Sequence, residues 1–168
     1  MQSTFKIEKD KRIVRRWLIF FMIMLALSGI TAIPVETELN FLSRFFPVDS
    51  SIGQWLDKVC VAFHDTNNNY PFLAYGYDWL AFAHIVLAIL FIGPVMDPVR
   101  NKWVVQFGMI ACVLIIPFAF IAGHFRSIPL MWTLIDCSFG VAGLFPLTIC
   151  LKKINKIESI QREHEITD

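Results

Sequence analysis

Residues 103–125 read WVVQFGMIACVLIIPFAFIAGHF. This run opens on a tryptophan and contains no Asp, Glu, Lys or Arg. A helix needs about 20 apolar residues to cross about 30 Å of hydrocarbon, so the run is long enough to span a bilayer. We therefore expect a membrane-spanning helix over these residues.

Three further stretches have the same character. The expected spans are residues 17–35, 79–96, 103–125 and 127–151, and each has a tryptophan at or near its N-terminal end, as aromatic anchors at the headgroup level do. A basic arm precedes the first span, which makes a cleaved signal peptide the alternative there. The residues after that span form a poor cleavage site, so we expect an uncleaved helix. The sequence predicts an all-α integral membrane protein, a four-helix up-down-up-down bundle.

The composition agrees with this fold class. Of the 168 residues, 56% are hydrophobic and only 17% are charged, whereas soluble domains have about 45–50% apolar and about 25% charged residues. A formal net charge of +1 without a basic face excludes an electrostatic case for nucleic-acid binding. The lipid bilayer is the expected partner.

The basic residues predict the orientation of the bundle. Twelve of the 15 Lys and Arg residues lie in the N-terminal arm, in the connection 97–102 and in the tail 152–168. The remaining three are Arg44, Lys58 and Arg126, which lie on the opposite side. Because cytoplasmic segments carry an excess of Lys and Arg, we expect both termini and the tail 152–168 in the cytoplasm.

The long segment between the first two spans is too long for a structureless connection. Helical periodicity over 39–46 and 52–63 predicts an outer helical segment over residues 38–64, with Asp49, Ser50 and Ser51 as helix-starting residues. Thr66 to Asn69 are expected to form a polar turn. The second helix is amphipathic, so it either lies in the membrane interface or covers the mouth of the bundle as an extracytoplasmic lid.

Two polar side chains lie inside the expected spans. His84 is about 7–8 Å and Asp136 about 10 Å along the helix axis from the same end of the bundle, so the two lie at similar depth. Polar groups inside a membrane usually find partners, and we expect a contact between His84 and Asp136. That pair either holds a proton and orients a ligand, or it only fixes how the helices pack.

A wider candidate ligand site surrounds this pair. Its residues are His84, Asp136, His124, Arg126, Tyr77 and Asp78, with Arg126 offering a positive charge to an anionic ligand. The expected function is binding of a small ligand or handling of protons. The alternative is a structural or accessory subunit that packs against another membrane protein or against a second copy of the chain.

Redox chemistry is a third hypothesis. A b-type haem needs axial ligands, but His124 lies at the end of its span while His84 lies further in. A quinone site fits the His, acid and aromatic residues without a diagnostic motif. The cysteines, Cys60, Cys112, Cys137 and Cys150, form no close pair in sequence, and only Cys60 and Cys137 could approach one another if the lid folds down. No metal site is predicted, and the cofactor stays open.

Several motifs are similar to those of a known group of proteins. They are Tyr75-Gly76-Tyr77-Asp78-Trp79-Leu80-Ala81-Phe82-Ala83-His84, Gly93-Pro94, Asp97-Pro98-Val99-Arg100-Asn101, Gly123-His124, Ile128-Pro129 and Leu134-Ile135-Asp136-Cys137-Ser138-Phe139-Gly140. Over the C-terminal two thirds the chain resembles uncharacterised bacterial four-span integral membrane proteins. The resemblance implies a four-span bundle in the bacterial inner membrane, and it implies no established activity.

Overall fold

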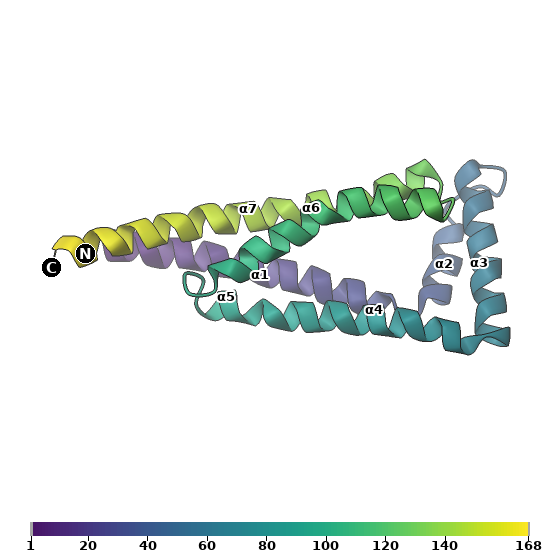
Figure 1. Cartoon of the computed structure of the whole chain (residues 1–168), viewed down its shortest axis with the longest axis horizontal. Helices are drawn as coiled ribbons and strands as arrows, with labels where there is room; N and C mark the ends of the chain where they lie inside the picture. The colour runs from purple at the N-terminus through teal and green to yellow at the C-terminus, as the bar shows by residue number, and fades with distance from the viewer. Residues whose placement is uncertain (1, 168) are drawn as a thin grey trace. The chain divides into compact units, whose positions relative to one another are not determined.

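The computed structural model describes residues 2–167, and the side chains of residues 5–163. Over that range the chain is all-helical and contains no strand (Figure 1). The helices are α1 (Gln2–Thr31), α2 (Val35–Ser43), α3 (Ser51–Asn69), α4 (Pro71–Leu90), α5 (Ile92–Met96), α6 (Lys102–Phe125) and α7 (Leu130–Thr167).

Four helical stretches are long and apolar enough to cross a membrane. They are Phe5–Thr31, Pro71–Met96, Lys102–Phe125 and Leu130–Glu163. Each contains most of one expected span, and these helices indicate a multi-pass membrane protein. The chain divides into two compact units. We call Met24–Ala88 the α2–α3 unit, and the residues up to Ile23 together with those from Ile89 onward the α6–α7 unit.

In the α2–α3 unit, the start of α3 follows the sequence closely. Ser50 is the N-cap, and its Oγ accepts a hydrogen bond of 3.0 Å from the backbone N–H of Gly53. The expected amphipathic face is confirmed, because Leu56 is buried whereas Asp57 and Lys58 on the opposite face are exposed.

The end of α3 differs from the expectation. The prediction of a polar turn at Thr66 to Asn69 is wrong, because α3 continues through Asn69. Side-chain hydrogen bonds between residues one helical turn apart stabilise this end of α3. One of them is a 2.6 Å bond from Asn69 Nδ2 to Asp65 Oδ1. Its C-cap is Tyr70, directly before the proline that opens α4.

The end of α1 packs closely on α4 within the same unit. A Cβ atom placed on Gly29 would lie 2.8 Å from the backbone oxygen of Ala81 and 2.9 Å from Cβ of His84. Gly29 and Ala81 are both buried. The absence of a side chain on Gly29 therefore allows the backbones of the two helices to approach, as small residues do in membrane proteins.

In the α6–α7 unit, a tight connection makes α6 and α7 antiparallel neighbours, which lie side by side (Figure 1). Ser127 has φ 54°, and the backbone N–H of Ile128 donates to Gly123 O at 2.9 Å, the pattern of a left-handed C-terminal helix cap. Lys102 Nζ at the start of α6 binds Glu158 Oε2 on α7 at 2.8 Å. The pair of helices α6 and α7 is therefore joined by polar contacts at both of its ends.

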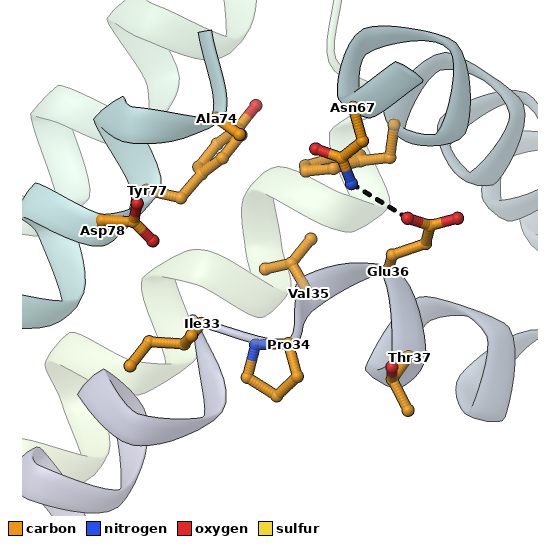
Figure 2. A pocket seen from close by; sticks show the side chains of 10 residues that line it. Ile33, Pro34, Val35, Glu36, Thr37, Asn67, Ala74, Tyr77 and Asp78 are labelled. Atoms are coloured by element: carbon orange, nitrogen blue, oxygen red, sulfur yellow. Dashed lines mark hydrogen bonds between the residues drawn. The ribbon is translucent and has the colours of Figure 1, made fainter. Parts of the chain in front are cut away.

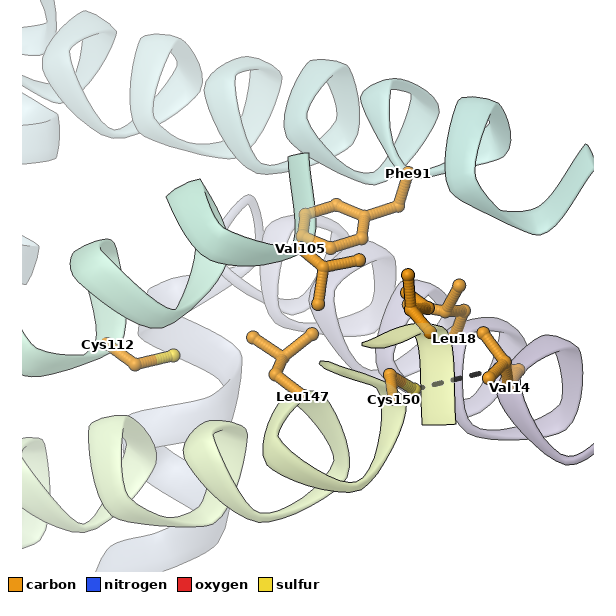
Figure 3. Close-up of a cluster of buried hydrophobic side chains, with 8 residues drawn as sticks. Val14, Leu18, Phe91, Val105, Cys112, Leu147 and Cys150 are labelled. Carbon is orange, nitrogen blue, oxygen red and sulfur yellow. Dashed lines mark hydrogen bonds between the residues drawn. The ribbon is translucent and has the colours of Figure 1, made fainter. Parts of the chain in front are cut away.

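The apolar core of this unit contains side chains from α1, α6 and α7, together with Phe91 just before α5 (Figure 3). Phe21 on α1 packs on Phe91 with ring centroids 4.8 Å apart. The buried members are Val14, Leu18, Phe91, Val105, Cys112, Leu147, Cys150 and Ile154. Most other apolar side chains on these helices are exposed, as is expected of surfaces that face lipid.

Two helices extend far beyond the expected spans. α1 begins at Gln2 rather than near Trp17, and α7 continues to Thr167 through the expected tail. These extensions pack on one another, because Asp10 of α1 accepts a 2.7 Å bond from Nζ of Lys153 on α7. Ile154 and Ile157 on α7 are buried as well.

Candidate functional site

A cavity of about 250 Å³ lies within the α2–α3 unit. Its wall comes from the turn before α2, the first turn of α2, one face of α3 and the second turn of α4. In Figure 2, Tyr77 and Asp78 lie on one side of the cavity and Asn67 and Glu36 on the other. The lining residues are Ile33, Pro34, Val35, Glu36, Thr37, Phe63, Asn67, Ala74, Tyr77 and Asp78.

Glu36 is held in place by two side chains of α3. Its Oε1 lies 2.8 Å from Nδ1 of His64, and its Oε2 accepts a 2.9 Å bond from Nδ2 of Asn67. Asn68 Nδ2 lies 2.9 Å from the other ring nitrogen of His64. With Asn68 as donor, the His64 tautomer carries its proton on Nδ1 and donates it to Glu36. These bonds fix α2 on α3 and keep one carboxylate at the cavity wall.

The same bonds stabilise the ionised form of Glu36. The pKa of Glu36 lies below its ordinary value of 4.5, first because of the hydrogen bond from His64 and then because of the bond from Asn67. Glu36 also lies in the first turn of α2, where the helix dipole favours a negative charge. The cavity therefore has a carboxylate at neutral pH.

Acidification should loosen α2 from α3. Because the folded pKa of Glu36 is lowered, its contribution to stability is fully present above the unfolded value of 4.5 and is lost as the pH falls through the folded pKa. We expect amides of Val35–Ser43 to lose protection from hydrogen exchange only as the pH falls below about 4.5, after correction for intrinsic exchange rates.

The matched variants for this experiment lie on the same helix. Glu36→Gln should already show weakened protection at neutral pH and should respond less to acid. Glu38→Gln, two residues along α2, removes a carboxylate for which no hydrogen bond or ion pair is found among the described side chains. It should behave like the unchanged protein. Equal acid sensitivity in both variants would contradict a role for the Glu36 bonds.

The opposite wall of the cavity combines an acid with aromatic rings. Asp78 and Tyr77 are both exposed on α4. The Tyr77 ring packs on Phe63 of α3, with centroids 5.0 Å apart and an interplanar angle of 35°. Among the described residues, no Lys or Arg lines this cavity. The lining therefore has two carboxylates and an aromatic pair, and it has no side chain that would balance an anionic ligand.

The structure places the six residues expected at the site in different parts of the chain. Tyr77 and Asp78 line the cavity. His84 lies further along α4, is half-buried, and is absent from the lining. Its Nδ1 lies 2.8 Å from Leu80 O. Since a carbonyl oxygen only accepts, Nδ1 carries the proton and Nε2 is left as the acceptor nitrogen.

The other three expected residues belong to the α6–α7 unit. His124 and Arg126 are exposed at the end of α6, where the His124 ring contacts the Phe125 ring with centroids 5.7 Å apart. Asp136 is half-buried on α7. The expected contact of Asp136 with His84 joins a residue of each unit and stays a prediction.

Sequence reasoning missed Glu36 and His64, and it assigned Asn67 to a turn. A usable signal existed, because His64, Asn67 and Asn68 recur at a spacing of three and four residues, which places them on one face when the helix continues. The expected turn at Thr66 ended the periodic pattern too early. The partner Glu36 lies 28 residues away in sequence, and no local pattern connects it to His64.

The cysteines do not favour thiol chemistry. All four are free thiols, and Cys112, Cys137 and Cys150 are buried. On α3, burial raises the pKa of Cys60, with the charge of Asp57 adding to the effect. Because the thiolate is the reactive form, a raised pKa makes Cys60 a weak nucleophile at neutral pH.

Comparisons with known proteins complete the description of the site. No family model, no curated protein and no solved structure matches the chain.

Proposed function

We propose that this chain is a multi-pass protein of the bacterial inner membrane with both termini in the cytoplasm. The excess of Lys and Arg in the N-terminal arm, the connection 97–102 and the tail supports this orientation. The resemblance to bacterial four-span proteins supports the location. In this arrangement the four long helices run up-down-up-down, and α2 and α3 form an extracytoplasmic cover that bears the cavity.

The proposed function of the cavity is the binding of a small organic cation on the outer side of the membrane. The observation that carries the proposal is the lining: Glu36 and Asp78 supply negative charge and Tyr77 an aromatic face, without a lining Lys or Arg among the described residues. A cation within about 6 Å of an aromatic centroid is attracted by the ring. Small ligands with a quaternary or protonated amine match this chemistry.

Choline and its neutral isostere 3,3-dimethylbutanol test the proposal directly. The two probes have the same shape and differ in charge, so only the electrostatic and cation–π contributions separate them. We expect choline to bind the purified full chain saturably and at least about tenfold more tightly than the neutral probe. Isothermal titration calorimetry in a neutral detergent measures both affinities.

The matched variants distinguish the cavity from the general surface. Asp78→Asn removes a lining carboxylate and should weaken choline binding by about tenfold. Asp57→Asn removes an exposed carboxylate from α3 that lies outside the cavity, and it should leave binding unchanged. Equal binding of the two probes, or an equal effect of the two variants, would argue against a cation site.

A further inference from the structure

Two adjoining cavities lie in the α6–α7 unit, beside the start of the first apolar run. One, of about 360 Å³, lies between α1, the connection after α5, and α7. The other, of about 70 Å³, lies between α1 and the end of α5. Lys11, Met96 and Pro98 line both cavities, so the two adjoin, and we call them together the recess.

The recess is rich in cations. Lys11, Arg12 and Arg15 of α1 line it from one side, and Arg100 of the connection lines it from another. The acidic lining residues are Glu8 and Asp97, which leaves an excess of two positive charges. This balance is opposite to that of the cavity in the α2–α3 unit.

Among the described residues, carboxylates neutralise few of these cations. Arg15 donates from Nε to the backbone oxygen of Val95 at 3.3 Å, and Arg12 donates from Nε to the backbone oxygen of Glu8 at 3.4 Å. Of the four recess cations, only Lys11 has a described carboxylate within 4 Å, which is that of Glu8 at 3.6 Å. The arginines therefore keep terminal nitrogens for a ligand, and a guanidinium binds phosphate oxygens well.

Other cations of the same unit behave differently. Lys153 and Lys156 on α7 lie 2.7 Å and 3.6 Å from the carboxylate of Asp10. Arg162 on the same helix binds Glu158 at 2.7 Å. Asp10 and Glu158 thus neutralise cations of α6 and α7, whereas the arginines of the recess donate to backbone oxygens or have no partner among the described side chains.

The position of the recess points to a lipid. Arg12 and Arg15 lie five and two residues before Trp17, where the apolar run begins, and Arg100 lies three residues before Trp103. Trp103 is 65% exposed, and Met96 at the recess is 74% exposed. Cationic side chains beside exposed apolar and aromatic ones are typical of the level at which phospholipid phosphates lie.

We propose that the recess formed by Lys11, Arg12, Arg15 and Arg100 binds the phosphate group of an anionic phospholipid. The phosphate accepts hydrogen bonds from the guanidinium groups, and the acyl chains lie along the exposed apolar surface beside Met96. The recess shares no residue with the cavity of the α2–α3 unit, so the lipid site is independent of the cation site proposed above.

Native mass spectrometry of the full chain, released from a neutral detergent, tests the proposal. The probes are dihexanoyl phosphatidylglycerol and dihexanoyl phosphatidylcholine, which share the phosphate and differ in net charge. We expect one phosphatidylglycerol to be retained about tenfold more strongly than phosphatidylcholine. Equal retention of the two lipids would overturn the proposal.

Three variants locate the site. Arg100→Gln and Arg12→Gln each remove a lining guanidinium and should weaken phosphatidylglycerol retention by about tenfold. Arg16→Gln is the matched control, because Arg16 is exposed on α1 and lines neither cavity. An Arg16→Gln effect as large as that of Arg100→Gln would mean that general surface charge retains the lipid, and would overturn the site.

A soluble competitor separates the two sources of a phosphate group. If glycerol phosphate displaces phosphatidylglycerol at millimolar concentration, the recess recognises the phosphate group alone, and a soluble phosphate compound fits it as well. If glycerol phosphate fails to displace the lipid while the arginine variants still weaken retention, the site is specific for a membrane-embedded lipid.

Discussion

Replacing Gly140 with alanine should lower the free energy of unfolding by about 2 kcal/mol. A Cβ atom at this position would lie 2.5 Å from the backbone oxygen of Cys112 on α6. A backbone oxygen in a regular helix cannot move alone, so α6 and α7 would have to separate. Unfolding in mixed micelles of neutral detergent and SDS, followed by circular dichroism, measures the loss.

Two other glycines provide graded controls for this prediction. At Gly143 the added Cβ would lie 2.8 Å from Sγ of Cys112, a side-chain atom that can rotate away. Gly143→Ala should therefore cost only about 1 kcal/mol. At Gly76 on α4 the added Cβ would meet no described atom within 4 Å. Gly76→Ala should leave stability unchanged or raise it by up to about 1 kcal/mol.

A second substitution separates the two kinds of close contact. Cys112→Ala removes the sulfur that opposes Gly143 but leaves the backbone oxygen that opposes Gly140. It should therefore relieve much of the cost of Gly143→Ala and little of the cost of Gly140→Ala. Equal relief of both, or Gly140→Ala as harmless as Gly76→Ala, would show that α6 and α7 are not in close backbone contact at this point.

The packing of α6 on α7 was predictable because small residues recur along both helices. Gly108, Cys112 and Gly123 recur along α6, Gly140 and Gly143 along α7, and small residues of this kind permit close helix approach in membranes. The spans themselves were predictable from hydrophobicity. Helix ends were not, because hydrophobicity reports which residues can lie in lipid and not where backbone hydrogen bonding stops.

The α1 and α7 extensions illustrate this limit. Residues 2–16 and 152–167 are rich in charge, so the hydrophobic signal does not extend into them. The helices nevertheless continue, because Val14 of α1 packs with Cys150 and Ile154 of α7 in one core. Cys150, Ile154 and Ile157 are spaced by four and three residues, which indicates that the helix continues. The pattern is too short to predict which helix lies opposite.

The candidate site was predictable only in part, for a similar reason. Tyr77 and Asp78 lie next to an apolar span, where a rim of aromatic and polar residues is expected, and both line the cavity. Glu36 lies opposite them, where its bonds to His64 and Asn67 join α2 to α3. His64 and Asn67 recur at helical spacing, but no local pattern in one sequence connects them to Glu36.

An ion pair between Asp10 and Lys153 joins the extensions of α1 and α7, and its two side chains are unequally buried. The Asp10 side chain is 5% exposed, whereas the side chain of its partner Lys153 is 32% exposed. The bond from Lys153 Nζ to Oδ1 is 2.7 Å long, while Oδ2 has no hydrogen-bond partner among the described residues and lies 3.6 Å from Lys156 Nζ. Asp10 therefore depends on Lys153 more than Lys153 depends on Asp10.

Lys153→Met should consequently lower the free energy of unfolding by about 3 kcal/mol, because it leaves a buried carboxylate without its hydrogen bond. Asp10→Asn should cost only about 1 kcal/mol, because the ammonium group that it leaves behind can reach water. The same micelle unfolding experiment ranks the two variants.

Lys152→Met is the matched control, since Lys152 is an exposed neighbour on α7, and it should change stability little. Asp10→Asn in the Lys153→Met background should recover part of the loss, because the second change removes the stranded charge. If Asp10→Asn alone cost as much as Lys153→Met, the unequal burial of the two side chains would not determine the stability of the pair. The order of the two single variants therefore decides whether the burial of Asp10 makes the loss of Lys153 the more costly of the two changes.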